Sequence, residues 1–518
     1  MDAHAQTEIR INTTEWVYPI ESFHCVAPSE PCSFAAAIER GQSSFGATVT
    51  ACFEDGNPAC LQTTDPGYNA ATGKWHLKSG DPFDSYIIDR DDMVMDFRLH
   101  VDGWDSPADN KIVLDVQTTI PPNQLFLISG SGNQMAGMDI IGDVEISYLL
   151  VRADTGGAVS TENVFGPGLV LTGYESGVAI RLRGAGVLNN RIVGNWCGIR
   201  GDGTEVAANS EHCVEILEGA SGNVIGGPDP ADRNVFAGNL DSAIQISDAS
   251  TRDNVIEGNY IGLDATGITA AGNSTGIALV REAQATKVFG NIISGNTIDG
   301  ILADNTSTEF GRLITRIEDN YIGPDASGVR GPGNAGCGIV VRGLAKNVQA
   351  KNNRIWFNKG CGVVISGANA RDNTITRNSM TQNDGKALLV ASGANENVRP
   401  PEIAVAKPDR INGTACPFCL IEVFTDPVDE AESFEGETTA DATGAWVLSR
   451  PGGFAYRFVT ATATDGRNTS ALSEAMLVER GDLPTRTPTG RPGATPTRTP
   501  EVRWLAVHLP WAGKDASP

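Results

Sequence analysis

The feature that most constrains this chain is a repeated segment. The residues NYIGLDATG at 259–267 return as NYIGPDASG at 320–328. Related segments around both copies place their first apolar residue at intervals of about 24 residues, with longer intervals where an NYIG copy intervenes; these residues are Ile244, Ile277, Ile301, Ile339, Val363 and Leu388. Repeats of about 20 to 50 residues are typical of solenoids. The unit therefore has about 24 residues, and GLDATGITAAG and GPDASGVRGPG are predicted to be loops inserted into it.

A finer spacing within the unit predicts its secondary structure. Asparagines recur at five-residue intervals with an apolar residue two positions after each, as in Asn254, Ile256 and Asn259. The same interval separates Asn291 from Asn296 and Asn353 from Asn358. Alternation of this kind is the signature of short strands with one buried face, and the frequent turn residues leave no room for ordinary helices. Each unit is predicted to be one coil of a right-handed parallel β-helix, so the fold class is all-β.

The asparagines have a structural explanation in such a fold. Parallel strands stack about 4.8 Å apart, so equivalent residues of successive coils lie above one another. An Asn at a bend can adopt a left-handed backbone conformation and pass side-chain hydrogen bonds along the stack. The alternative is a solvated turn residue, which fits any one position but does not explain the fixed interval.

The cysteines and the net charge limit the location and the partners. Ten cysteines form five near pairs: Cys25 and Cys32, Cys52 and Cys60, Cys197 and Cys213, Cys337 and Cys361, Cys416 and Cys419. Close, even pairing favours disulfides and an oxidising compartment, although stacked thiols at Cys337 and Cys361 or a zinc site at Cys416 and Cys419 are alternatives. The segment Ala3-His4-Ala5 resembles the end of a cleaved signal peptide. A secreted or cell-surface protein is therefore expected.

The composition argues against two classes of partner. The chain has 63 acidic and 39 basic residues and a formal charge of −24, which disfavours non-specific binding to nucleic acid. It contains no run of apolar residues long enough to span a bilayer, so membrane insertion is not expected.

The pattern divides the chain into five parts. Residues 1–82 lack the repeat and are predicted to cap the solenoid, and residues 83–395 form the β-helix. Residues 398–479 contain alternating strands that suit a small Ig-like β-sandwich. Residues 480–500 are a Pro/Thr-rich linker, and residues 501–518 form a short apolar tail.

Three of these parts resemble known families. The segment Cys32-Ser33-Phe34-Ala35-Ala36-Ala37-Ile38 is similar to the CSLREA segment at the N-terminus of bacterial surface β-helix proteins, without its Arg and Glu. The N-x-I-G-x-D-x-x-G and G-N-x-x-G-I patterns resemble those of secreted right-handed β-helix repeat proteins of bacteria. The C-terminal part resembles the Ig-like modules appended to bacterial surface proteins. These resemblances imply the fold and a surface location, but they imply no particular activity.

A catalytic site is not recognisable in the sequence. An inverting pectinase-type hydrolase needs two carboxyl groups about 6.5 to 9.5 Å apart, and its Asn-Thr-Asp, Asp-Asp, His-Gly and Arg-Ile-Lys elements do not occur in the repeats. A calcium-dependent lyase needs several carboxylates that converge on one ion. The repeated Asp264 and Asp325 are two coils apart, about 9.6 Å, and are expected to form Asx-type turns instead. No cofactor is expected, and calcium has no support.

Four aromatic residues form the candidate ligand-binding set. Trp196, Tyr260 and Tyr321 each follow a ladder Asn, so alternation points them outward, and Trp356 lies on a nearby strip. Such a row can stack on sugar rings, or it can pack beneath the inserted loops. The leading hypothesis is a protein for adhesion or polysaccharide binding. A polysaccharide lyase or glycoside hydrolase acting in the groove is the first alternative, and a purely structural exoprotein is the second.

Overall fold

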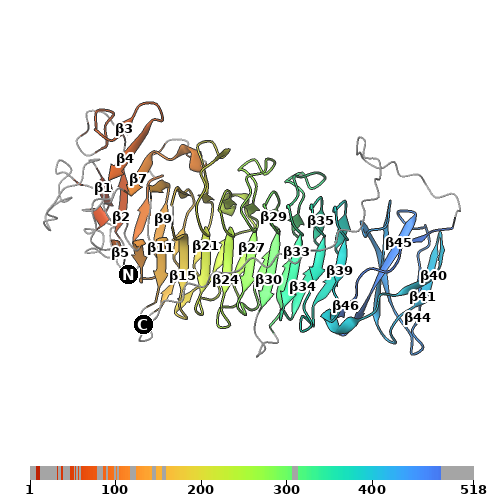
Figure 1. The fold of residues 1–518 in the computed structure, drawn as a ribbon. Coiled ribbons are helices and arrows are strands. Elements are labelled where there is room, and N and C mark those ends of the chain that lie inside the picture. Colours follow the sequence, from red (N-terminus) through yellow and green to blue (C-terminus); the bar gives the residue numbers. More distant parts are fainter. Residues whose placement is uncertain are drawn as a thin grey trace. The chain divides into compact units, whose positions relative to one another are not determined.

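The computed structural model describes residues 8–11, 32, 37–38, 47–51, 53, 57, 60–78, 86–88, 92–98, 101, 104, 106–116, 124–142, 147–153, 159–174, 176–305 and 313–479. The Pro/Thr-rich linker and the tail predicted after residue 479 lie outside this range. The described part is a stack of short strands followed by a β-sandwich (Figure 1).

Three long sheets run along the stack. Sheet 1 consists of β1 (Glu8–Ile11), β2 (Thr48–Ala51), β6 (Val94–Asp96), β9 (Gln134–Ala136), β13 (Val164–Phe165), β17 (Arg191–Ile192), β22 (Val224–Gly226), β25 (Val255–Glu257), β28 (Lys287–Phe289), β31 (Thr315–Glu318), β34 (Val348–Lys351) and β37 (Thr374–Thr376). Sheet 2 consists of β3 (Tyr68–Asn69), β4 (Lys74–Lys78), β7 (Ile112–Val116), β10 (Met138–Gly142), β14 (Val170–Thr172), β18 (Trp196–Cys197), β23 (Val235–Phe236), β26 (Tyr260–Ile261), β29 (Ile292–Ile293), β32 (Tyr321–Ile322), β35 (Arg354–Trp356) and β38 (Ser379–Thr381). Sheet 3 consists of β5 (Tyr86–Ile88), β8 (Gln124–Ile128), β11 (Ser147–Arg152), β15 (Val178–Arg183), β21 (Val214–Leu217), β24 (Ile244–Ser247), β27 (Ile277–Val280), β30 (Ile301–Asn305), β33 (Ile339–Gly343), β36 (Val363–Ile365) and β39 (Leu388–Val390).

Smaller elements lie between these strands. They are the pair β12 (Ser160–Thr161) and β16 (Val187–Leu188), the hairpin β19 (Ile199–Arg200) and β20 (Glu205–Val206), and the 3-10 turns η1 (Pro107–Asp109), η2 (Pro230–Asp232) and η3 (Ala394–Asn397).

The strand register confirms the repeat and the predicted parallel β-helix. In sheet 3, Ile244 pairs with Ile277, which pairs with Ile301, and the series continues through Ile339, Val363 and Leu388. In sheet 2, Tyr260 pairs with Ile292 and Ile292 with Tyr321, so the two NYIG copies lie two coils apart. Apart from the β3–β4 hairpin, neighbouring strands of the three sheets are parallel.

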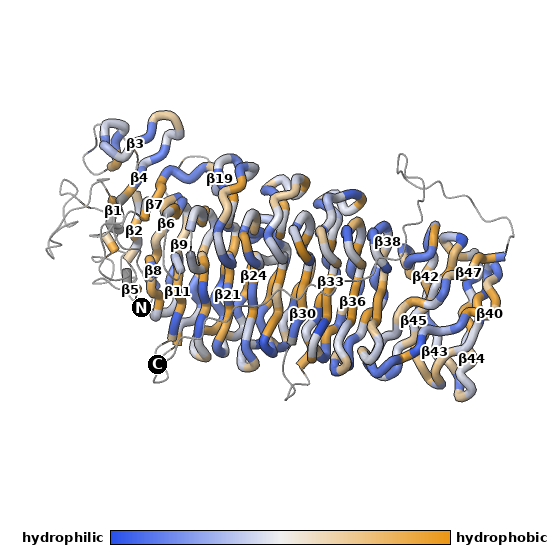
Figure 2. The backbone as a smooth tube through the Cα atoms, viewed as in Figure 1, coloured by the Kyte–Doolittle hydropathy of each residue, from blue (hydrophilic) through white to orange (hydrophobic). Residues whose placement is uncertain are grey.

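The core is a continuous column of inward side chains. Along sheet 2, for example, Ile261, Ile293 and Ile322 are all fully buried, and they alternate with outward residues. Figure 2 shows apolar strands alternating with hydrophilic bends along the stack. Each coil therefore buries its apolar face against its two neighbours, as a solenoid requires.

In the part of the chain that the structure describes, three asparagine ladders follow the bends, and their side chains are buried. Asn259 illustrates the pattern: its Nδ2 donates to Asn291 Oδ1 (3.0 Å) and Ile225 O (2.9 Å), and its Oδ1 accepts from Asn234 Nδ2 (2.9 Å). The first ladder is Asn133, Asn163, Asn190, Asn223 and Asn254. The second is Asn195, Asn234, Asn259, Asn291, Asn320, Asn353 and Asn378, and the third is Asn209, Asn239, Asn273, Asn296, Asn334, Asn358 and Asn383.

The ladders correct one detail of the repeat pattern. The shared five-residue interval predicts that Asn254 and Asn259 occupy the same bends as Asn291 and Asn296, but Asn291 stacks on Asn259. The five-residue interval is the length of one short strand between two bends. Two successive sides of the coil have this length, so the interval alone does not identify which bend an Asn occupies.

The parallel pairing begins earlier than the predicted boundary at residue 83. Strand β1 pairs in parallel with β2, and β2 with β6, while β4 pairs with β7. Part of the segment predicted as a cap thus supplies strands to sheets 1 and 2. The sequence did not reveal this because the early strands lack the Asn and Gly spacing. Of the CSLREA-like stretch, the described residues are Cys32, Ala37 and Ile38, and all three are buried. Residues 33–36 lie outside the described part.

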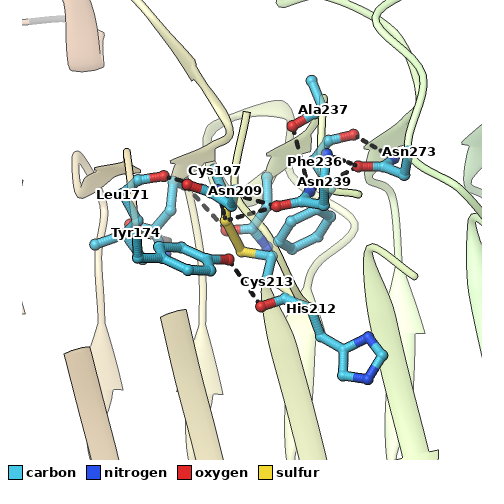
Figure 3. Close-up of a disulfide and its surroundings, with 12 residues drawn as sticks. Leu171, Tyr174, Cys197, Asn209, His212, Cys213, Phe236, Ala237, Asn239 and Asn273 are labelled. Atoms are coloured by element: carbon cyan, nitrogen blue, oxygen red, sulfur yellow. Dashed lines mark hydrogen bonds between the residues drawn. A yellow bond between two sulfur atoms is a disulfide. The ribbon is translucent and has the colours of Figure 1, made fainter. Parts of the chain in front are cut away.

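Three of the predicted cysteine pairs lie wholly within the described residues, and all three are disulfides. Cys197 and Cys213 are joined in the core, where Asn209 Nδ2 donates to Cys197 Sγ (3.6 Å) beside the third ladder (Figure 3). Cys337 and Cys361 bridge adjacent coils with Cα atoms 4.5 Å apart, so these residues are not stacked thiols. Cys416 and Cys419 are also bridged, which rules out the zinc alternative there. Cys32 and Cys60 each take part in a disulfide. Their predicted partners, Cys25 and Cys52, lie outside the described residues.

The C-terminal strands form the expected Ig-like sandwich. One sheet has the order β40 (Glu402–Lys407), β41 (Arg410–Thr414), β44 (Ala445–Ser449). The other has the order β43 (Ser433–Thr439), β42 (Leu420–Asp426), β45 (Phe458–Asp465), β46 (Asn468–Thr469), and β47 (Met476–Leu477) also pairs with β45. All pairs are antiparallel. Two packed antiparallel sheets whose strands alternate between them are typical of this class.

Candidate functional site

The predicted aromatic residues lie on the outer face of sheet 2. Its register aligns Trp196, Val235, Tyr260, Ile292, Tyr321 and Arg354 in one column. Because the next residue of these strands is buried in the core, the column faces outward. Trp356 lies two residues beyond Arg354 on the same face. The three aromatic residues of the column occupy alternate strands, about 9.6 Å apart.

Their exposure differs from the expectation at one position. Tyr260, Tyr321 and Trp356 are partly exposed, but Trp196 is only 7% exposed. Trp196 belongs to a small apolar cluster outside the main core, with Val170, Ile199, Val235, Ala237 and Ala271. The prediction that Trp196 offers a surface to a ligand is therefore wrong, because the inserted segments after β18 and β26 fold over its ring.

Glycines in the inserted loops explain how these rings are covered. A Cβ on Gly203 would lie 2.9 Å from the Trp196 ring, and one on Gly267 would lie 2.6 Å from the Tyr260 ring. Gly328 has the same relation to Tyr321, at 2.6 Å. All three have positive φ, which favours glycine. The loops also bond to each other, since Ala265 N donates to Gly203 O and Ala326 N to Gly267 O, both at 2.9 Å.

Two arginines that the sequence analysis missed accompany the tyrosines. The guanidinium carbon of Arg233 lies 4.3 Å from the centroid of the Tyr260 ring. That of Arg354 lies 5.1 Å from the Tyr321 ring and 4.6 Å from the Trp356 ring. Both groups also donate to backbone carbonyls, Arg233 to Gly258 and Arg354 to Gly328. Arg354 directly follows the ladder residue Asn353, as Tyr321 follows Asn320. The same position after a ladder Asn could therefore have predicted from the sequence that Arg354 faces outward beside the tyrosines.

The repeated aspartates act as turn residues, as expected. Asp264 Oδ1 accepts from Thr266 Oγ1 (2.6 Å) and from the backbone N–H of Thr269 (3.2 Å). Burial opposes ionisation of Asp264, but these hydrogen bonds prevail and hold its pKa below the usual value. Asp325 likewise accepts from the N–H of Ser327 (2.9 Å). Within the described part of the chain, no group of three or more His, Cys, Asp or Glu side chains is arranged to hold a metal ion.

An ion pair on the early part of sheet 2 also escaped the sequence analysis. Lys74 Nζ lies 2.6 Å from Asp139 Oδ2, and Asn110 Nδ2 donates to Asp139 Oδ1 (2.9 Å). Burial raises the pKa of Asp139, while Lys74 and Asn110 counteract this effect. The pair combines an acid and a base on the face that also carries the tyrosines. No local pattern indicated it, because the two residues are distant in an irregular part of the sequence.

Comparison with known proteins adds a family similarity for one part of the β-helix. Residues 265–396 match the model of the NosD family. That family is described as periplasmic copper-binding protein (NosD), and the match covers about a quarter of the chain. No curated protein matches the chain.

Several solved structures are similar at low sequence identity. Pectate lyase Pel9A is 13% identical over 74% of this chain and 80% of that chain, with a TM-score of 0.39. The periplasmic alginate epimerase AlgG is 12% identical over 67% of this chain and 74% of that chain, with a TM-score of 0.37. The Dettilon tailspike protein is 12% identical over 88% and 90%, with a TM-score of 0.32. At these values the similarity carries no inference about activity. The described residues also include no helix long and apolar enough to cross a membrane.

Proposed function

We propose that this chain is an extracytoplasmic β-helix protein, secreted or displayed at the cell surface, that binds polysaccharides or cell-surface glycans in adhesion. Its disulfides support an oxidising compartment. The similarity to a family described as periplasmic supports the same side of the membrane. The charge of −24 argues against nucleic acid as a partner.

The observation that carries the proposal is the row of paired rings and guanidinium groups on sheet 2. Tyr260 with Arg233, and Tyr321 with Arg354 and Trp356, lie on one outer face and are partly exposed. Aromatic rings offer apolar surface to the faces of sugar rings, and guanidinium groups donate several hydrogen bonds to hydroxyl or carboxylate oxygens. The repeat places equivalent groups at regular intervals, which suits a polymeric ligand.

Replacing both Tyr260 and Tyr321 by alanine is expected to abolish binding to the glycans that the parent chain retains on a polysaccharide array. The matched Tyr→Phe variants keep the rings and are expected to retain binding. Phe418→Ala removes an aromatic residue that is 71% exposed on the sandwich, and it should have no effect. Unchanged binding by the double alanine variant would refute the role of this face and leave packing beneath the loops as the function of these rings.

A polysaccharide lyase or glycoside hydrolase acting in the groove is the second candidate, and the Lys74–Asp139 pair favours it. Acidic and neutral polysaccharides should be incubated with the full chain, with and without calcium, while unsaturated products and new reducing ends are measured. Cleavage would establish the enzyme, whereas binding without cleavage supports the proposal. If the chain neither binds nor cleaves any of these polysaccharides, the result would favour a purely structural exoprotein.

Copper binding does not fit the matched segment. Copper prefers His, Cys and Met ligands. Residues 265–396 contain no histidine, the two cysteines Cys337 and Cys361 form a disulfide, and Met380 is buried in the core. No copper site is proposed.

A further inference from the structure

The C-terminal sandwich covers the last coil of the β-helix and pairs its strand edges. Met380 in β38 exchanges two backbone hydrogen bonds with Ala431, at 2.8 and 2.9 Å. The N–H of Ile375 in β37 donates to Thr469 Oγ1 (3.0 Å). Unpaired edges of this kind invite pairing with other chains, so the sandwich protects the end of the solenoid.

Several acceptors at this junction are carboxyl groups of the sandwich. Gln382 N donates to Glu430 Oε2 (2.5 Å), and Arg377 N donates to Glu422 Oε2 (3.2 Å). The hydroxyl of Thr376 donates to Glu422 Oε1 (2.5 Å), and that of Thr381 donates to Asp426 Oδ2 (2.8 Å). Glu422 is 1% exposed and Asp426 is fully buried. These carboxyl groups therefore lose water and gain mainly uncharged donors.

The charges around these groups do not balance. The negative charges of Asp426 and Asp429 repel a negative charge on Glu430, and the charge of Glu437 does the same to Glu422. Among the described residues, two cations act on these carboxyl groups: Arg377 forms an ion pair with Glu437 (2.9 Å) and also lies near Glu422, and Arg354 lies near Glu432. Arg467 also crosses the junction, but its guanidinium group donates to Asn347 Oδ1 (3.0 Å). Glu432 also accepts from the hydroxyl of Tyr456, and Glu435, within the sandwich, is paired with Arg450. Six carboxyl groups thus face two guanidinium groups; they are Glu422, Asp426, Asp429, Glu430, Glu432 and Glu437.

We propose that the junction between the β-helix and the C-terminal sandwich is a pH-sensitive latch, closed while its buried carboxyl groups hold protons and opened as they ionise. The protonated groups add no like charge to the junction and satisfy its backbone donors. Ionisation places several negative charges in a poorly hydrated interface with few cations, which favours separation of the sandwich from the last coil. The strand edges of β37 and β38 then become accessible.

The pKa values of these carboxyl groups also favour a closed junction at low pH. Burial, and then the charge of Asp426, raise the pKa of Glu430 to about 8. Burial also raises the pKa of Glu422, Asp426 and Glu432, although hydrogen bonds counteract it. A separated sandwich exposes the groups and restores ordinary pKa values near 4. The closed state therefore binds more protons, so it is favoured at low pH and is progressively lost as the pH rises towards about 8.

Hydrogen exchange of the full chain, followed by mass spectrometry, tests the latch. After correction for intrinsic exchange rates, the protection of residues 372–384 is expected to fall between pH 5 and 8, by up to about tenfold per pH unit for each proton released. Glu430→Gln removes the most strongly shifted group while keeping its shape. It should flatten this dependence and leave the segment protected at high pH.

Two comparisons make the result decisive. Glu474→Gln removes an exposed carboxylate of the same sandwich and should reproduce the parent profile. Residues 255–262, in the middle of the solenoid, should keep constant protection, which separates opening of the junction from global unfolding. Constant protection of residues 372–384 across this pH range would overturn the proposal. So would an identical pH profile in the Glu430→Gln variant.

Discussion

Replacing Asn259 by alanine is expected to destabilise the coils around it by about 4 kcal/mol. The side chain is fully buried and joins three successive coils. Alanine would leave the Asn234 amide, the Ile225 carbonyl and the Asn291 amide oxygen without this partner. Buried groups left in this way cost about 1 to 3 kcal/mol each, and partial relaxation reduces the sum.

Segment-resolved hydrogen exchange is the appropriate measurement, because each coil contacts only its neighbours and the loss is therefore local. Protection should fall most in the strands that flank residue 259, and less towards the ends of the stack. Lys287→Ala, at an exposed position on β28, is the control and should change stability by less than about 0.5 kcal/mol. If Asn259→Ala lowers stability no more than the control does, the ladder is a consequence of the fold and does not stabilise it.

The ladder also shows why so much of the fold could be predicted. A bend that stacks on itself imposes the same residue at each coil, so the requirement appears in the sequence as a period. The register from Ile244 to Leu388 followed from that period alone. Before residue 133 no ladder Asn is present among the described residues. The strands of this part, such as β4 and β7, are held by apolar packing, which many sequences can satisfy.

The candidate site was less predictable, because facing outward is not the same as being exposed. Alternation placed Trp196 and Tyr260 on the same face correctly. It carried no information on how the inserted loops would fold back over the rings, which depends on Gly203 and Gly267 lying against them. The carboxyl groups of the junction are a further example, since their burial depends on how two domains meet.

Replacing Phe424 by alanine is expected to destabilise the junction by about 3 to 5 kcal/mol. Phe424 is 2% exposed and packs edge-to-face on Phe434, with ring centroids 5.7 Å apart. It belongs to the same buried apolar cluster as Met380 and Leu388 of the last coils. The side chain therefore extends the core of the solenoid into the sandwich, and its removal leaves a cavity where the column ends.

This substitution distinguishes a cap from an independently appended module. If the sandwich caps the solenoid, Phe424→Ala should lower the protection of β37, β38 and β39 together with that of β42, while the middle coils keep theirs. Val447→Ala, at a partly exposed position on β44, should leave all of them unchanged. Loss of protection confined to the sandwich would contradict the cap, because a solenoid whose last coil is stable alone does not depend on its neighbour. If the last coils and the sandwich lose their protection together in a single transition, they form one cooperative unit, although the sequence pattern divides them.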